Sequence, residues 1–180
     1  MAIVAADIKK RFSVKTGAAG DSTASSAAAS LGKYVSTTDI TLATLNNLFR
    51  AITSDEAAVG ITLYRCFFIL NDHATYTFTD VLVWIASQIA GGGTVSMGLD
   101  PAGAAPRGQA GAQAAEIANE ETAPTGVTFS SPTTEGTALS IGDLAVDGCY
   151  AIWLKLVVPA GASALALDQA VLTVKGQTLP

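Results

Sequence analysis

The strongest constraint on the fold of this chain is a succession of short apolar runs, each about the length of one strand. The runs occupy residues 61–70, 75–85, 94–99, 128–130, 138–141, 149–158 and 170–174. β-branched and aromatic residues are frequent in them, and apolar positions alternate, as at Val81, Val83 and Ile85. Turn residues such as Asp147-Gly148 separate the runs. Seven or so short strands with this punctuation predict an all-β fold, an antiparallel β-sandwich of jelly-roll or immunoglobulin-like type with little helix.

Two stretches between these runs lead to more local predictions. The runs at 61–70 and 75–85 flank a turn cluster, Asn71-Asp72-His73, so we expect them to form an antiparallel pair. Residues 100–111 are rich in Gly and Pro, which predicts an exposed loop.

One helical turn is expected before the first long strand. Residues 54–60 begin with Ser and two acids and end in Gly, which is typical of a short capped helix. Residues 38–52 fit one face of a helix moderately, but they can also be divided at Asn46-Asn47, and we predict non-helical structure there.

The N-terminal part differs from the rest in composition and charge. Residues 16–30 are nearly all Ala, Ser, Gly and Thr, which bury too little surface to offset their ordering entropy alone. Residues 1–33 carry five basic and two acidic side chains, while the other five basic and thirteen acidic residues follow. We therefore predict an extended N-terminal arm or linker over 1–33 and a β-sandwich domain over 34–180, although the weak alternation at 7–14 is compatible with one strand.

The composition bears on assembly. Hydrophobic residues make up 49% of the chain and charged residues 14%, against roughly 25% charged residues in an ordinary soluble domain. A chain this poor in charge is expected to hide surface in a homo-oligomer or a larger assembly. A compact monomer with an Ala-rich and Gly-rich surface remains the alternative.

Several partner classes are not expected. No apolar run approaches the roughly 18 residues of a membrane-spanning helix, so we predict no membrane partner. The basic residues are few and no aromatic residues are interleaved with them, so we predict no nucleic-acid partner. The positive charges follow the first apolar residues rather than precede them, which is unlike a secretory signal, and synthesis in the cytoplasm is expected.

The two cysteines are predicted to be buried free thiols. Cys66 and Cys149 each lie inside an apolar strand-like run, where a thiol behaves as a small hydrophobic group. A cytoplasmic origin argues against a disulfide between them, although a bridge remains possible. The chain has no pair of cysteines with zinc-ligand spacing.

The residue types that carry chemistry do not form a recognisable site, so we assign no catalytic, cofactor-binding or metal-binding residue. The single histidine, His73, lies in a turn cluster, and no glycine-rich run matches a phosphate-binding loop. The candidate carboxylates are Glu116, Glu120, Glu121, Asp143 and Asp147. Paired carboxylates can serve glycosidases, but aromatic residues total only 7% and acids are common in turns for backbone reasons. Calcium in a sandwich loop stays open without assigned ligands.

The two tryptophans also do not indicate a binding site. Trp84 and Trp153 are flanked by Val, Ile and Leu in apolar runs, which indicates core or interface positions rather than a sugar-binding face.

A series of short words between about residues 36 and 175 resembles a group of small virion structural proteins of tailed bacteriophages. The words are LNNLF at 45–49, SDEAA at 54–58, YRCF at 64–67, VLVWI at 81–85, GLDPA at 98–102, ANE at 118–120, TAP at 122–124, VTF at 127–129, IGDL at 141–144, AIWLK at 151–155 and VPAGA at 158–162. They are spaced words and not a catalytic signature, and residues 16–30 show the least resemblance.

The resemblance implies a non-enzymatic structural protein of the virion. From the size, the lack of chemistry and the arm, we expect a capsid decoration or cement protein on the capsid surface. Its expected partners are the major capsid protein and further copies of itself, as a homotrimer. The alternative is a tail, baseplate or head-fibre component whose β-sandwich binds a receptor or glycan, which would call for an exposed aromatic patch. We expect no enzymatic activity.

Overall fold

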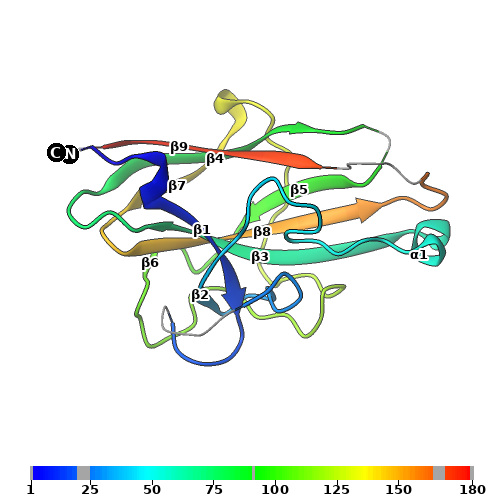
Figure 1. Cartoon of the computed structure of the whole chain (residues 1–180), viewed down its shortest axis with the longest axis horizontal. Helices are drawn as coiled ribbons and strands as arrows, with labels where there is room; N and C mark the ends of the chain where they lie inside the picture. The colour runs from blue at the N-terminus through cyan, green and yellow to red at the C-terminus, as the bar shows by residue number, and fades with distance from the viewer. Residues whose placement is uncertain (1, 20–24, 91, 164–168, 179–180) are drawn as a thin grey trace.

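The computed structural model describes residues 2–19, 25–90, 92–163 and 169–178, and it shows two antiparallel sheets packed face to face (Figure 1). The larger sheet has the strand order β2 (Tyr34–Asp39), β1 (Ile8–Val14), β3 (Ile61–Asn71), β8 (Gly148–Val158) and β5 (Thr94–Leu99), with the short β6 (Ala105–Pro106) also paired to β8. The smaller sheet has the order β7 (Leu139–Leu144), β4 (Phe78–Gln88) and β9 (Ala170–Thr178). One α-helix, α1 (Ser54–Val59), and two 3-10 turns, η1 (Ala5–Asp7) and η2 (Glu135–Thr137), complete the described elements. The predicted antiparallel β-sandwich with little helix is confirmed.

The inner core lies between the two sheets. Period-two alternation turns Phe67 and Ile69 of β3 toward Val83 and Ile85 of β4, and all four side chains are buried. Ile152 and Leu154 of β8 belong to the same cluster. Each strand therefore contributes one apolar face to this core, as the sequence pattern predicts.

A second core covers the outer face of the larger sheet. The side chains there, on the opposite faces of β3 and β8, are as fully buried as those of the inner core, with Phe68, Cys149 and Trp153 at 0% exposure. A layer of loops, roughly residues 30–33 and 113–129, packs against them together with Val35 at the start of β2. Because β3 and β8 are buried on both faces, they read as continuous apolar runs rather than as clean alternations. Both cysteines are buried free thiols, as predicted.

Backbone and buried polar contacts fasten this loop layer to the sheet. The Cys66 N–H donates to the Ser30 carbonyl at 3.0 Å, beyond the point where β1 ends. On the outer face, one carboxylate oxygen of Asp100 accepts the indole N–H of Trp153 and the backbone N–H of Ala115, both at 2.8 Å. Asp100 is buried, and these bonds supply the hydrogen-bond partners that a buried polar side chain requires.

The predicted pairing of runs 61–70 and 75–85 is wrong. β3 pairs with β1 and β8, whereas β4 pairs with β7 and β9 in the other sheet. The connection crosses between the sheets, and the Asn71 side chain holds it by donating to the carbonyls of Tyr76 and Leu144, each at 2.9 Å. Apolar alternation allowed both arrangements, because it marks the face that is buried and does not name the strand that lies alongside.

Two further stretches differ from their predictions. Most residues of 100–111 are exposed, as predicted, but Asp100 and Ala105 are buried and Ala105–Pro106 forms β6. Run 128–130, expected to be strand-like, forms only an isolated bridge between Ser130 and Met97. In both cases the segment lies against a strand edge or face that it covers.

The segment 1–33, predicted as an arm or linker, contributes a strand to the domain. Ile8–Val14 is β1, an interior strand between β2 and β3, and its Ile8 and Phe12 lie in the inner core. Of the Ala-rich stretch 16–30, residues 20–24 lie outside the described residues. Ala19 and Ser30 are buried against the domain. The structure therefore does not separate residues 1–33 from a domain that begins at residue 34.

The local predictions around α1 are confirmed. Ser54–Val59 is helical, and Gly60 follows it with φ +81°. Residues 40–52 contain no helix.

Gly32 should be essential for seating the loop layer. Its φ is +91°, and a Cβ placed on it would lie 1.8 Å from the Ala115 carbonyl oxygen. We expect Gly32→Ala to lower the free energy of unfolding by about 3 kcal/mol or more, because a strained backbone and a forced displacement add together. Urea denaturation measures this change. Gly111→Ala, where nothing lies within 4 Å of the added carbon, should change it by less than about 0.5 kcal/mol, and equal losses would contradict the assignment.

Candidate functional site

The most exposed large apolar side chains lie in the loop between β2 and α1 and in α1 itself. Leu42, Leu45 and Val59 are 62, 65 and 78% exposed. Other residues of the same loop, Leu48 and Phe49, pack against the inner core. Leu48 and Phe49 thus anchor the loop while Leu42 and Leu45 are exposed to solvent, which makes this loop a candidate interaction surface.

Backbone conformation contributes to this display. Ala43 and Asn46 both have φ +56°, in the left-handed region that non-glycine residues seldom adopt. Such a conformation costs about 1 kcal/mol or more per residue and persists only where the surroundings hold it. The surroundings here include a network of charged side chains at the C-terminal end of the loop.

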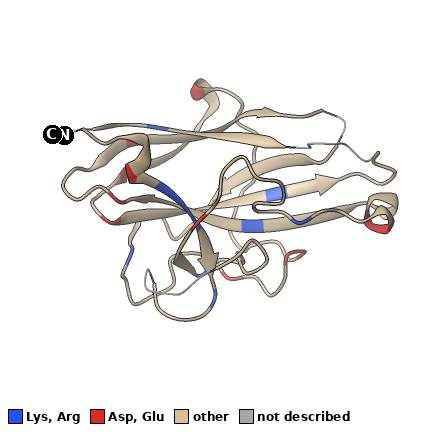
Figure 2. Cartoon of the chain, viewed as in Figure 1, with Lys and Arg blue, Asp and Glu red and all other residues tan. Residues whose placement is uncertain are grey.

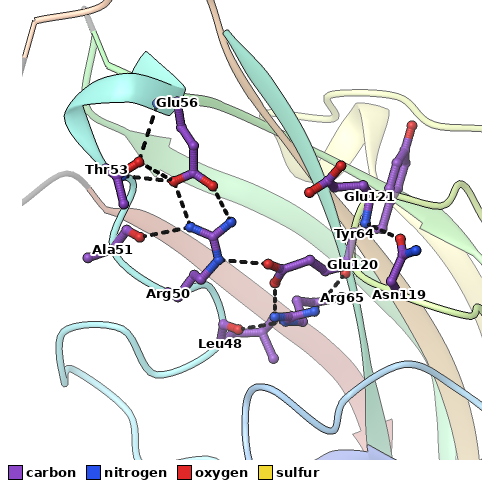
Figure 3. Close-up of polar contacts among 10 residues, drawn as sticks. All are labelled: Leu48, Arg50, Ala51, Thr53, Glu56, Tyr64, Arg65, Asn119, Glu120 and Glu121. Carbon is purple, nitrogen blue, oxygen red and sulfur yellow. Dashed lines mark hydrogen bonds and ion pairs between the residues drawn. The ribbon is translucent and has the colours of Figure 1, made fainter. Parts of the chain in front are cut away.

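Arg50 is the centre of this ion network (Figure 3). Its Nη1 and Nη2 atoms donate to the two carboxylate oxygens of Glu56 at 2.8 and 2.5 Å, and its Nε donates to Glu120 Oε1 at 2.7 Å. The forked pairing with Glu56 is the strong bidentate geometry of a guanidinium with a carboxylate. These hydrogen bonds raise the pKa of Arg50, and those to Glu56 contribute more than the one to Glu120.

Arg65 extends the network into the sandwich. It lies on the same face of β3 as Phe67 and Ile69, and it is 3% exposed. Its Nη2 donates to Glu120 Oε2, and its Nε donates to the Leu48 carbonyl at 3.2 Å. Burial lowers the pKa of the Arg65 guanidinium while Glu120 opposes that change. The charges therefore alternate from Glu56 through Arg50 and Glu120 to Arg65.

The network ties four parts of the chain together. Glu56 belongs to α1, Arg50 to the exposed loop, Glu120 to the loop layer and Arg65 to β3 (Figure 3). The backbone carbonyl of Glu120 also accepts the Tyr64 N–H at 2.6 Å. The loop that displays Leu42 and Leu45 is consequently fixed at its C-terminal end.

Glu56 has a second role as the N3 residue of α1. Its carboxylate accepts the backbone N–H and the hydroxyl of Thr53, both at 2.9 Å, while its own N–H donates to Thr53 Oγ1. This capping box closes the start of a helix too short to be stable alone. The bonds from Arg50 first, and then those from Thr53, lower the pKa of Glu56 to about 2.

A shallow pocket of about 530 Å³ lies beside the network, between the exposed loop, the segment 27–31 and the segment 118–120. Alanines at 27, 28, 51 and 118 line much of it, together with Arg50 and Glu120. Both carboxylates of the network are engaged by guanidinium groups. The arrangement suits contact with an apolar segment better than acid–base chemistry.

The carboxylates singled out in the sequence are dispersed among separate contacts. Glu116 pairs with Lys15 and Lys33, while Glu120 belongs to the Arg50 network and Glu121 is exposed. The acids at 143 and 147 bond to different groups, the Asp80 N–H and the Arg107 guanidinium. Within the described part of the chain, no group of three or more potential metal ligands lies together.

The remaining candidates have structural surroundings. His73 is half-buried, stacks on Tyr76 and accepts the Thr75 and Tyr76 N–H groups at Nδ1, both at 3.1 Å. Trp153 is fully buried in the second core. Trp84 is half-buried on the outer face of the smaller sheet, where it pairs with Thr173 of β9.

The sequence interpretation missed Arg50 and Arg65. Arg65 carried a usable signal, since one charge inside a ten-residue apolar run is expected to have a buried partner. Arg50 carried none, because its two carboxylates come from segments 6 and 70 residues away.

Comparisons of the chain with protein-family models, with curated proteins and with solved structures found no match. No helix in the described ranges is long and apolar enough to cross a membrane.

Removal of the Glu120 carboxylate should destabilise the fold through Arg65. The Arg65 side chain is 4% exposed, so Glu120→Ala leaves a buried charge without its partner, and we expect a loss of about 3 kcal/mol. The double variant Arg65→Met/Glu120→Leu should recover part of this loss, because it removes both charges. Urea denaturation compares the variants with Glu121→Ala as the exposed control. Equal stability of Glu120→Ala and Glu121→Ala would contradict the role.

Glu56 should make stability depend on pH in the acid range. Its pKa in the folded state, about 2, lies below that of an unfolded glutamate, about 4.3. Its contribution is therefore complete above about pH 4.3 and is lost as the pH falls toward 2. We expect Glu56→Gln to flatten the fall of the thermal unfolding temperature between these pH values, with Asp55→Asn as the control. An unchanged slope would exclude the contribution.

Proposed function

We propose that the chain is a non-enzymatic structural protein of a tailed-phage virion, a decoration or cement protein that binds the outer capsid lattice. Its partners in this proposal are the major capsid protein and other copies of itself in a homotrimer. The observation that carries the docking part of the proposal is the display of Leu42 and Leu45 on a loop held by the Arg50 network. The resemblance of residues 36–175 to small phage virion proteins agrees with it.

The physical demands of such a role match this surface. A cement protein has to bury apolar area against a lattice while its own shape stays constant. Leu42 and Leu45 offer apolar area, and the ion network and capping box keep the supporting loop in one conformation. A low fraction of charged residues, 14%, reduces the desolvation required on docking.

The second candidate, a tail, baseplate or head-fibre component that binds a receptor or glycan, is less well supported. It calls for exposed aromatic side chains, on which sugar rings stack. Every aromatic side chain in this chain is buried or half-buried, and the exposed large apolar residues are all aliphatic. A failed capsid-binding experiment would favour this second function.

Co-sedimentation with expanded capsids assembled without this protein tests the proposal. We expect saturable binding of the full chain at a fixed ratio to the capsid protein. Leu42→Asn/Leu45→Asn should weaken binding about a hundredfold, because two exposed leucines lose their buried area. Val146→Asn, at a separate site that is 39% exposed, is the matched control.

The outcomes separate the candidates. Absence of binding by the full chain would overturn the cement role. Binding that the leucine variant leaves unchanged would move the lattice contact away from this loop. Deletion of residues 1–33 is unsuitable as a test because it removes β1 from the interior of the sheet.

A further inference from the structure

The free edge of β9 differs from the other sheet edges in the described part of the chain. β7 and β2 have six residues each, and each of these edge strands itself holds additional residues at a register shift in its pairing. The outer edge of β5 is covered where Met97 and Ser130 exchange backbone hydrogen bonds at 2.8 and 2.9 Å. β9 has nine residues, no proline and one charged side chain, Lys175 (Figure 2). Short length and bulges are among the usual protections against strand addition, and β9 has neither. The segment before η1 contacts its last residue, where the Ile3 N–H donates to Thr178 Oγ1 at 3.2 Å.

The backbone of β9 turns alternate residues outward. Both register shifts in the β4–β9 ladder insert the additional residue into β4, so β9 alternates regularly. The carbonyls of Gln169 and Gln177 accept bonds from Ile89 N–H and Thr79 Oγ1 of the β4 segment. Residues of even number, among them Leu172 and Val174, therefore direct their N–H and C=O groups away from β4. No described segment forms a backbone hydrogen bond to these outward groups.

Beside this edge lies the open side of the sandwich, between β9 of the smaller sheet and β1 of the larger sheet, which we call the mouth. The side chains of Leu172 and Val174 face the inner core yet stay half-buried. A cavity of about 270 Å³ lies next to Val174, between β9, β1 and the segment 3–5. A strand added to β9 would direct alternate side chains toward this cavity.

Lys10 places an uncompensated charge in the same mouth. It lies on the face of β1 that carries Ile8 and Phe12, pairs with the core residue Ile69 and lines the cavity. Its Nζ donates to the Ile8 carbonyl at 3.1 Å, and no described carboxylate lies within ion-pair distance of it. Burial lowers the pKa of Lys10, and the positive charge of the neighbouring Lys9 lowers it further.

The contrast with Arg65 indicates what is missing. Both residues are basic and lie on the inner face of the larger sheet, at opposite ends of the β1–β3 region. Arg65 has the carboxylate of Glu120, whereas Lys10, within the described residues, bonds to a backbone carbonyl and pairs with no carboxylate. Lys175, the other cation lining the cavity, is already paired with Glu135 at 2.6 Å. An inward-pointing cation opposes an apolar strand and favours one that brings a carboxylate.

We propose that the β9 edge binds an extended segment of a partner protein by β-augmentation, with a carboxylate of that segment paired to Lys10. Main-chain hydrogen bonds to the outward groups of β9 supply affinity, and the carboxylate supplies selectivity. A second β9 is a poor occupant, because residues 170–178 contain no acid. This surface is separate from the Leu42 loop, and the inference holds whether or not the chain binds capsids.

Short blocked peptides of alternating Val and Thr, with Glu, Gln or Lys at one central Val position, are the probes. We expect the Glu peptide to bind the full chain about tenfold more tightly than the Gln peptide, and the Lys peptide not to bind. Lys10→Gln should abolish the preference for Glu. Lys9→Gln, on the opposite face of β1 and paired with Leu70, is the matched control and should retain it.

Amide hydrogen exchange measured by NMR locates the bound peptide. The amides of Leu172 and Val174 should exchange fast in the free protein and slowly with saturating Glu peptide. The amides of Thr173 and Lys175, which face β4, should be protected in both states. Failure of all three peptides to bind, equal affinity for them, or binding without protection at Leu172 and Val174 would each overturn the proposal.

Discussion

The antiparallel pairing of β3 with β8 is the constraint on which the rest of the structure depends. Ten consecutive residue pairs join them, from Ile61 with Val158 to Leu70 with Cys149. Since both strands are buried on both faces, the pair needs a layer on each side. The smaller sheet supplies one layer and the loops supply the other, so the molecule has two cores that share a central pair of strands (Figure 1).

This arrangement changes how the composition is interpreted. The high apolar and low charged content suggested surface hidden in an assembly, yet part of it is explained by the second core beneath the loops. The most exposed of the large apolar side chains are few and lie close together in the sequence. Leu42 and Leu45 project from a loop whose other apolar residues are packed inward, and Val59 projects from α1. The surface argument for a binding role therefore rests on these side chains and not on the overall composition.

Two charged side chains on the inner face of the larger sheet differ in whether a carboxylate pairs with them. Arg65 and Lys10 both lie where an apolar side chain would be expected, and a charge in such a position is costly unless it is paired. Glu120 compensates Arg65 and in doing so fastens the exposed loop to the sheet. In the part of the chain that the structure describes, Lys10 bonds to the Ile8 carbonyl, at the open side of the sandwich. The first charge is part of the architecture, and the second is the basis for inferring an external partner.

The fold class, most strand positions, the α1 turn and the burial of the thiols could be predicted from the sequence, because they depend on local period-two patterning and capping. The placement of β3 and β4 in different sheets could not be predicted, since alternation specifies a buried face and not the neighbouring strand. The tertiary structure also placed Ile8–Val14 inside the sheet, where the weak pattern of this segment is supported by two adjoining strands. The Arg50 network was equally beyond the sequence, because Arg50 and Glu120 lie 70 residues apart and only folding brings their charges together.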